Sequence, residues 1–420
     1  MDSGSVVSMK DKNSKFRDAL KGGDKRPSAQ PVGEQPAGSY RLTDTGQMKP
    51  LSQNIVVYLG AVLPNALGWD MLSDQPVWRQ KPPFLPEYRA EIHDQDASEL
   101  AFWASDQLGA DFKTAQALEA IQVHSKRKPF HPVQEYLSGL RWDGTPRIDH
   151  WLSDAFGVAP SDYHRAVARS FLIAAVARCM TPGCQVDTML VLMGDQGLGK
   201  TSAVRELAPD FGMYAETTES PANKDFYQAL RGKWIVEIGE LHSFRNADWT
   251  KIKQMLSAKV DTYRPSYGHF TKDFPRQCVF IGTTNDDQWN RDPTGARRFW
   301  PVKCLEVNRD YIRQQRDQLW AEAVERHQKG EGWWTIPDTE EHTQAVYESD
   351  PWEEPVLNFM AKYPKGNYVT VRQILIDALG FTDEKIGQRE NMRAASILKN
   401  KKFTHKRVTY NGAQRWVWVT

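Results

Sequence analysis

Residues 187–202 read DTMLVLMGDQGLGKTS, an apolar run followed by a glycine-rich turn and then a lysine. The run from Met189 to Met193 is short and uncharged, which is typical of a strand buried on both faces. A helix-forming segment, KTSAVREL, follows the turn. Further downstream, GKWIVEI, DWTKIKQML and RQCVFIGTTN continue the alternation of strand and helix patterns. This alternation predicts an α/β fold in which a parallel sheet carries helices on both faces.

The glycine-rich turn fits the pattern G-x(4)-G-K-S/T at every fixed position, in the strand-turn-helix context that the motif requires. Backbone N–H groups of such a loop surround a phosphate, and the helix N-terminus adds a partial positive charge. We therefore expect ATP here, with Lys200 on the β- and γ-phosphates and the Thr201 hydroxyl on Mg²⁺. The predicted nucleotide-binding residues are Gly194, Asp195, Gln196, Gly197, Leu198, Gly199, Lys200, Thr201 and Ser202.

Three polar residues that follow predicted strands are candidates for catalysis. The strand pattern KWIVEIGE (residues 233–240) ends in the carboxylates Glu237 and Glu240, and we assign Glu237 to Mg²⁺ and Glu240 to activation of the attacking water. The reverse assignment is the alternative, as is an exposed Glu240 without a role. Asn285 ends the next strand pattern, where an amide would contact the γ-phosphate unless it only closes a strand-end turn.

Arg297 and Arg298 lie between a Thr-Gly turn and the apolar segment FWPV. Paired guanidinium groups held this way suit the γ-phosphate of a neighbouring subunit. We assign both arginines to catalysis and expect a ring-shaped homo-oligomer. The alternative is an ordinary salt bridge.

These motifs resemble those of the virulence-associated protein E family, P-loop proteins of phages and mobile elements that are related to superfamily 3 helicases. The matching segments are residues 129–152, 184–202, 234–241, 260–268 and 278–302, which keep their order and spacing within residues 97–305. The resemblance implies an AAA+-like ATPase that assembles as a hexamer and translocates on DNA during replication of a mobile element.

The comparison with superfamily 3 also implies a hairpin that projects into the pore of the ring. Residues 260–267 and 274–278 read as its strands, with the turn between them. His269 and Lys272 are the candidates for contact with single-stranded DNA through its phosphates. Lys253 and Arg264 would serve the nucleotide or the subunit interface, or Arg264 would brace the hairpin.

Composition divides the chain into five parts. Residues 1–50 are polar and predict a disordered tail. Residues 51–96 predict a small module, 97–183 a helical region, 184–335 the ATPase core, and 336–420 a C-terminal domain. In this last part three helical patterns precede two strands joined by Asn411-Gly412, which suggests a winged-helix-like domain.

The end of the chain is strongly basic although the whole chain has a formal charge of only +1. Residues 391–420 contain seven Lys or Arg and no Asp or Glu. This concentration predicts contact with duplex DNA, and the alternative is a protein interface, which such domains also form. The predicted contacts are Lys401, Lys402, Lys406 and Arg407. We expect Trp416 and Trp418, two apart on one strand face, to belong to the domain core.

Several classes of protein are excluded or disfavoured. The four cysteines form no C-x-x-C pair, and no apolar run is long enough to cross a membrane, so we expect a protein of the bacterial cytoplasm. Too few residues precede the matching region for a primase domain, so priming would come from a separate partner. Asp94 and Asp96 mimic a metal pair but lie in a polar segment, which favours a structural role.

We therefore expect an ATP-dependent DNA helicase of a phage or mobile element, with ATP and Mg²⁺ at the glycine-rich turn. One alternative is a replication initiator that binds an origin without processive unwinding. The other is a regulatory binding protein whose assembly is switched by nucleotide.

Overall fold

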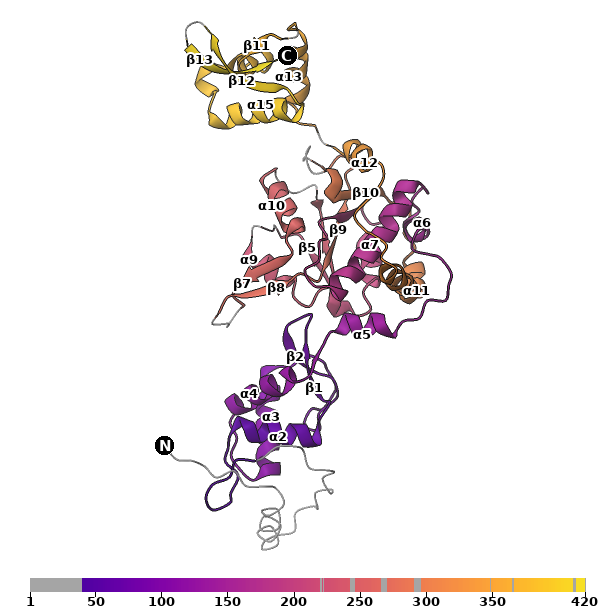
Figure 1. Cartoon of the computed structure of the whole chain (residues 1–420), viewed down its shortest axis with the longest axis vertical. Coiled ribbons are helices and arrows are strands. Elements are labelled where there is room, and N and C mark those ends of the chain that lie inside the picture. The colour runs from indigo at the N-terminus through magenta and orange to yellow at the C-terminus, as the bar shows by residue number, and fades with distance from the viewer. Residues whose placement is uncertain are drawn as a thin grey trace. The chain divides into compact units, whose positions relative to one another are not determined.

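The computed structural model describes residues 40–219, 221, 223–241, 246–265, 270–290, 296–347, 349–364, 366–410 and 413–419. The chain divides into two compact units, Met1–Gly139 and Leu140–Thr420, and each is described by itself (Figure 1). Among the described residues, no helix has the length and apolar character needed to span a membrane.

In the described part of the first unit, residues 40–139, four helices pack with a small sheet. The helices are α2 (Ser52–Val62), α3 (Asp94–Leu108), α4 (Thr114–Lys126) and α5 (Pro132–Gly139). The sheet has the order β2-β1-β3, formed by β1 (Leu67–Asp70), β2 (Gln75–Trp78) and β3 (Pro129–Phe130). Ile55, Leu100 and Ile121, from three of the helices, share one buried core.

This shared core differs from the predicted boundaries. Residues 51–96 are not a module separate from the helices that follow, because α2 packs against α3 and α4. The predicted tail also ends too late: Tyr40 and Met48 pack against this core, and the Arg41 N–H donates to Asn54 Oδ1 at 2.8 Å. Residues 1–39 lie outside the described residues.

Asp96 has the structural role expected of it. Its side chain is fully buried, accepts a hydrogen bond from Trp78 Nε1 at 3.0 Å, and forms an ion pair with Arg89. It also accepts the His93 N–H at 3.1 Å, which closes the first turn of α3. All its interactions therefore serve the fold of the first unit.

The second unit contains the predicted parallel sheet. Its five strands lie in the order β10-β4-β9-β6-β5 and every neighbouring pair is parallel. The strands are β4 (Met189–Met193), β5 (Tyr214–Thr217), β6 (Ile235–Ile238), β9 (Val279–Thr284) and β10 (Phe299–Lys303). The expected α/β class is confirmed. In this order β9 pairs with β4, the strand that enters the glycine-rich turn, and β6 pairs with β9.

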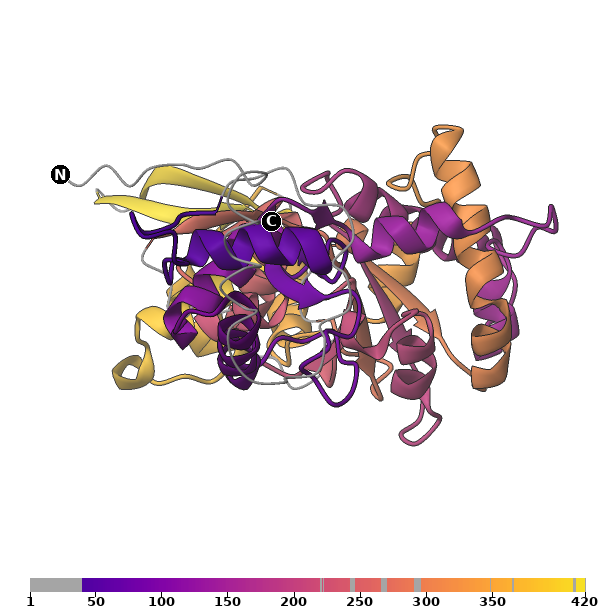
Figure 2. The ribbon, with the colours of Figure 1, turned by 90° about the horizontal axis from the view of Figure 1, so that it is seen from below.

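Helices cover both faces of this sheet (Figures 1 and 2). On one face lie α9 (Lys224–Ala229) and α10 (Asn246–Ser257), whose Phe226 and Ile252 share a core with strand residues Val191 and Val236. The other face carries α7 (Asp162–Met180) and α11 (Arg309–Gln328). Shorter helices are α6 (Trp151–Phe156), α8 (Lys200–Glu206), η1 (Phe211–Met213), η3 (Ala296–Arg298) and α12 (Thr339–Ala345).

The predicted helical region 97–183 is therefore not one structural part. Its first helices belong to the first unit, whereas α6 and α7 belong to the second. Tyr163 of α7 donates to the Pro301 carbonyl of β10 at 3.2 Å, and Trp234 Nε1 donates to the Ala175 carbonyl of α7 at 2.9 Å. The long apolar helix α7 thus packs against the parallel sheet of the second unit.

The C-terminal domain contains the expected helices and hairpin. Its helices are α13 (Glu353–Ala361), α14 (Val371–Gln373) continued by η4 (Ile374–Ala378), η5 (Asp383–Lys385) and α15 (Gln388–Asn400). A sheet of order β11-β13-β12 joins β11 (Tyr368–Val369), β12 (Thr404–Tyr410) and β13 (Ala413–Val419). Val356, Leu398 and Trp418 lie in its core. The predicted turn Asn411-Gly412 lies outside the described residues.

Candidate active site

A cavity of about 320 Å³ opens where β4, β6 and β9 end. Because these strands are parallel, the segments that follow them meet at one edge of the sheet. The lining residues are Gln196, Gly197, Gly199, Lys200, Thr201, Ser202, Glu216, Gly239, Glu240, Thr283, Thr284 and Asn285. Most of the predicted nucleotide-binding residues, together with Glu240 and Asn285, are thus brought into one cavity.

The glycines of the turn have backbone geometry that other residues avoid. Gly199 has φ +90° and directly precedes α8, and Gly194 has φ +151°. A Cβ on Gly194 would lie 2.8 Å from the Cys304 carbonyl oxygen, on the segment that follows β10. The turn therefore needs glycine both for its left-handed conformation and for close packing of neighbouring backbone.

Lys200 lies at the centre of the cavity and is 7% exposed. Its ammonium group donates to the carbonyl oxygens of Gly194 at 2.6 Å and Asp195 at 3.0 Å, and lies 3.4 Å from Asn285 Oδ1. Burial lowers the pKa of Lys200 below its usual value. The charge is thus held in a partly desolvated place, where it would interact strongly with a phosphate.

Glu237 is fully buried at the end of β6 and accepts three hydrogen bonds from hydroxyl groups. Thr201 Oγ1 donates at 2.6 Å, Tyr214 OH at 2.7 Å and Thr283 Oγ1 at 2.8 Å. Burial raises the pKa of Glu237, and the three donors oppose that rise. The Thr201 hydroxyl and this carboxylate supply hard oxygen ligands within reach of one ion, which suits Mg²⁺.

Glu240 differs from Glu237 in its surroundings. It lines the cavity but is exposed, and its backbone has φ +53°, a conformation that costs a non-glycine residue about 1 kcal/mol or more. Glu237 is enclosed by its donors, whereas Glu240 is open to water. The two carboxylates therefore differ in their access to water and in the number of hydrogen bonds that hold them.

Three residues around this cavity were missed in the sequence. Tyr214 and Thr283 bind Glu237, and Glu216 of β5 lines the cavity. Tyr214 and Glu216 lie in a segment without a motif, whereas Thr283 lies in the strand pattern that ends at Asn285. The positions of β5 and β9 on either side of β6 bring these residues to the cavity. Polar residues inside an otherwise apolar strand, such as Thr283 and Thr284, were the one available signal.

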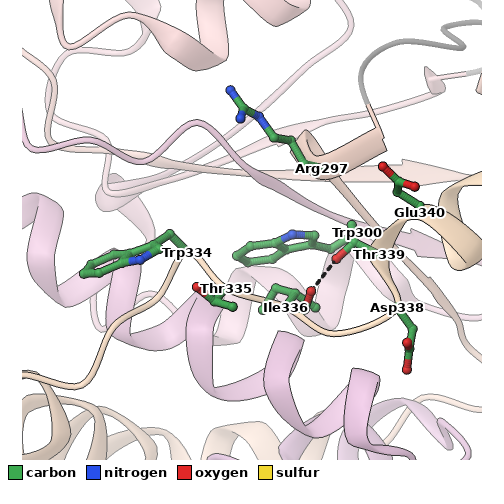
Figure 3. Close-up of a pocket in the computed structure, with 8 residues that line it drawn as sticks. All are labelled: Arg297, Trp300, Trp334, Thr335, Ile336, Asp338, Thr339 and Glu340. Carbon is green, nitrogen blue, oxygen red and sulfur yellow. Dashed lines mark hydrogen bonds between the residues drawn. The ribbon is translucent and has the colours of Figure 1, made fainter.

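The predicted arginines lie elsewhere. Arg297 is exposed and lines a second cavity of about 450 Å³, and in Figure 3 its guanidinium points away from the two indole rings there. Arg298 donates from Nε to Ser257 Oγ at 3.3 Å. Neither residue is among those that line the cavity around Lys200 in the same chain. The second cavity is formed by Arg297, Trp300, Trp334, Thr335, Ile336, Asp338, Thr339 and Glu340.

The predicted hairpin is present as β7 (Val260–Tyr263) paired antiparallel with β8 (Lys272–Pro275). Its base is fixed by a buried ion pair between Arg276 and Asp261. Lys272 was expected in the turn but is the first residue of β8, with its ammonium 5.4 Å from the Phe274 ring centroid. His269 lies outside the described residues. Phe270, which was not singled out, is 84% exposed beside the turn.

The remaining predicted contacts with DNA divide into two groups. Lys402, Lys406 and Arg407 are exposed, and Lys406 lies 4.8 Å from the Tyr368 ring centroid. Lys401 instead forms an ion pair with Glu353, so it links α15 to α13.

The prediction for the two tryptophans of β13 is half wrong. Trp418 is buried at 4% exposure, but Trp416 is 59% exposed. Both side chains project from the same face of β13, but the domain core contains Trp418 and does not extend to Trp416.

Comparison with known proteins places the chain in a family. A search of curated proteins finds no match. The apo structure of the NrS-1 C terminal region (305–718) is 13% identical, with a TM-score of 0.45 over 87% of this chain and 99% of that chain. The A form apo structure of the same region is also 13% identical, with a TM-score of 0.47 over 88% and 99%. The virulence-associated protein E-like domain model matches residues 137–351, more than half of the chain, and the protein therefore belongs to this family.

Proposed function

We propose that the protein is an ATP-driven DNA translocase, a superfamily 3-like ring helicase that acts in replication of a phage or mobile element. The hydrogen bond between Thr201 and Glu237 carries the proposal. It joins the residue after the motif lysine to a buried carboxylate on a separate strand, as a site for Mg²⁺ and a triphosphate requires. Membership of the virulence-associated protein E-like family supports the replication context.

Each residue has a definite role in the proposed hydrolysis. Lys200 and the backbone N–H groups of the turn bind the β- and γ-phosphates. Thr201 and Glu237 hold Mg²⁺, which would neutralise charge that develops on the phosphate oxygens. Glu240 orients the attacking water, and Asn285 contacts the γ-phosphate. In this proposal the buried carboxylate of Glu237 binds the metal, and the exposed carboxylate of Glu240 acts on the water.

Coupling to DNA would use the hairpin β7–β8 and a neighbouring subunit. Lys272 and His269 would contact single-stranded DNA in the pore of a homo-oligomer, expected to be a hexamer. Arg297 or Arg298 would reach the γ-phosphate of the adjacent subunit, which fits their distance from the phosphate cavity of their own chain. A separate primase would complete the system, in the cytoplasm of a bacterial host.

The C-terminal domain favours one alternative, a replication initiator that binds an origin without processive unwinding. Exposed Lys402, Lys406 and Arg407 on a helix-hairpin surface suit duplex contacts. Such a protein would hydrolyse ATP. Its binding to DNA would depend on the duplex sequence, and it would displace little of the complementary strand.

Strand displacement on a forked DNA separates the two functions. The helicase proposal expects ATP-dependent displacement that is lost in Glu237→Gln and strongly reduced in Lys272→Ala. Lys329→Ala should behave as wild type, because Lys329 lies at the end of α11 and pairs with Glu325. Hydrolysis without displacement, accompanied by sequence-dependent binding of duplex DNA, would favour the initiator.

A further inference from the structure

Three aromatic rings form a stack on the C-terminal hairpin. The His405 ring lies 4.4 Å from Trp418, centroid to centroid, at an interplanar angle of 20°. The same imidazole lies 4.7 Å from Trp416 at 28°. Trp418 is buried in the domain core, whereas Trp416 is 59% exposed. The stack therefore runs from the core to the surface and ends in a supported, solvent-exposed indole.

Positive charge lies beside the exposed end of this stack. Arg407 is the cross-strand partner of Trp416, so the two side chains lie on the same face of the hairpin. Arg407 is exposed, and no ion pair to a carboxylate is found for it within the described residues. By contrast, Arg393 pairs with Asp350 and Lys401 pairs with Glu353. Arg407 is therefore a cation beside Trp416 that is available to an anionic ligand.

An aromatic face beside a guanidinium group indicates which kind of ligand can bind there. Bases present a π-face that stacks on indole irrespective of sequence, and their phosphates pair with arginine. In a duplex the base faces are already covered by neighbouring base pairs, so only an unpaired base can add to the stack. A ligand that uses both features is single-stranded nucleic acid.

We propose that Trp416 is a stacking site for unpaired nucleobases, supported by His405 and flanked by Arg407. The inference rests on the proposed function, because it assumes that DNA is the substrate of the chain. It changes the expected role of the C-terminal domain, from duplex recognition to capture of a single strand. Its ligand is a backbone with bases, since the arginine alone would bind phosphates without requiring the indole.

Binding of labelled oligonucleotides to the full-length chain tests the proposal by fluorescence anisotropy. The probes are single-stranded oligothymidine, an abasic strand of equal length, and a duplex. Trp416→Ala should weaken binding of oligothymidine about 5- to 100-fold, as expected for one lost base-aromatic stack. Trp416→Phe, which keeps an aromatic face, should stay within about threefold of wild type. Binding of the abasic strand should not change in either variant.

Trp334→Ala is the matched control, because Trp334 is an exposed tryptophan (67%) outside this domain. It should leave oligothymidine binding unchanged. ATP hydrolysis without DNA should be the same in Trp416→Ala as in wild type, which shows that the variant is folded. Equal binding of oligothymidine by Trp416→Ala and wild type would overturn the inference. An equal loss on the abasic strand or on duplex would also overturn it.

The two proposals fail in different ways. If wild type binds oligothymidine and DNA stimulates its ATP hydrolysis, but Trp416→Ala matches it in both, only the stacking site is refuted. If wild type binds no probe, the DNA-dependent function fails and the stacking site fails with it.

Discussion

Burial shifts the pKa values of Glu237 and Lys200 in opposite directions. The pKa of Glu237 is raised because its carboxylate is desolvated, and the pKa of Lys200 is lowered for the same reason. The proposed ATP hydrolysis needs the deprotonated carboxylate and the protonated amine. We therefore expect it to be lost as the pH falls through the raised pKa of Glu237 and as the pH rises through the lowered pKa of Lys200.

The raised pKa of Glu237 predicts the effect of Tyr214→Phe on the pH profile of kcat/KM, which reports ionisations of the free enzyme. The variant removes the 2.7 Å hydrogen bond to Glu237 Oε2, one of the interactions that hold the carboxylate pKa down. The acidic limb should move to higher pH while the basic limb stays in place. Steady-state ATP hydrolysis measured across pH provides the test.

Tyr58→Phe is the control for that profile, because Tyr58 donates to Gln107 in the first unit. It should leave both limbs unchanged. An acidic limb of Tyr214→Phe that coincides with wild type would contradict the role given to Glu237.

Much of the site at residue scale was predictable, and the remainder depends on sheet order. The motif identifies Lys200 and Thr201, and the end of the apolar strand identifies Glu237. Tyr214 and Thr283 could not be found in the same way, because nothing local indicates that β5 and β9 flank β6. Trp416 was misassigned because strand alternation gives the face of a residue but not how far the domain covers that face.

At the scale of elements, β9 is the strand that fixes the geometry of the site. It lies between β4 and β6 and carries Thr283, Thr284 and Asn285 toward the cavity. Its Gly282 is closely packed, because a Cβ there would lie 2.4 Å from Leu241 Cδ1 and 3.3 Å from Met189 Cε. The absence of a side chain lets the segment after β6 approach β9.

Gly282→Ala should therefore destabilise the second unit by about 1–3 kcal/mol, the usual cost of overpacking a core. Calorimetry should show a lower melting temperature, together with reduced ATP hydrolysis as Leu241 and Glu240 are displaced. Gly139→Ala is the control, since nothing lies within 4 Å of a Cβ at that position. An unchanged melting temperature in Gly282→Ala would show that Leu241 moves aside without cost.

The elements themselves were predicted well where apolar runs are long. The strands β4, β6, β9 and β10 coincide with such runs, and the C-terminal hairpin with an alternating pattern. β5 was missed because Tyr-Ala-Glu-Thr has no apolar run and is paired on one side only. Domain boundaries were less accurate, because consecutive helices with similar composition pack into different cores.

At the scale of the whole molecule, the proposed ring requires two chains to build one active site. Neither arginine of η3 lines the phosphate cavity of its own chain. Mixing Lys200→Ala chains with Arg297→Ala chains, or with Arg298→Ala chains, should restore part of the ATP hydrolysis that each variant lacks alone. Some interfaces in the mixture then pair an intact phosphate site with an intact arginine.

Restoration should occur with the arginine that acts across the interface and not with the other. The control is a mixture of either arginine variant with wild type, without Lys200→Ala. Its rate of ATP hydrolysis shows how much mixing alone changes the activity. If both mixtures with Lys200→Ala stay inactive, neither arginine acts across the interface.

The most direct test of the central claim is steady-state ATP hydrolysis by the purified chain, with and without single-stranded DNA, at low and moderate salt. We expect Mg²⁺-dependent turnover that DNA stimulates several-fold, with stronger stimulation at low salt because phosphate contacts are less screened there. Lys200→Ala should abolish turnover, and Lys329→Ala should not. Turnover that persists in Lys200→Ala would contradict the assigned site, and turnover that ignores DNA would contradict the coupling of that site to a DNA translocase.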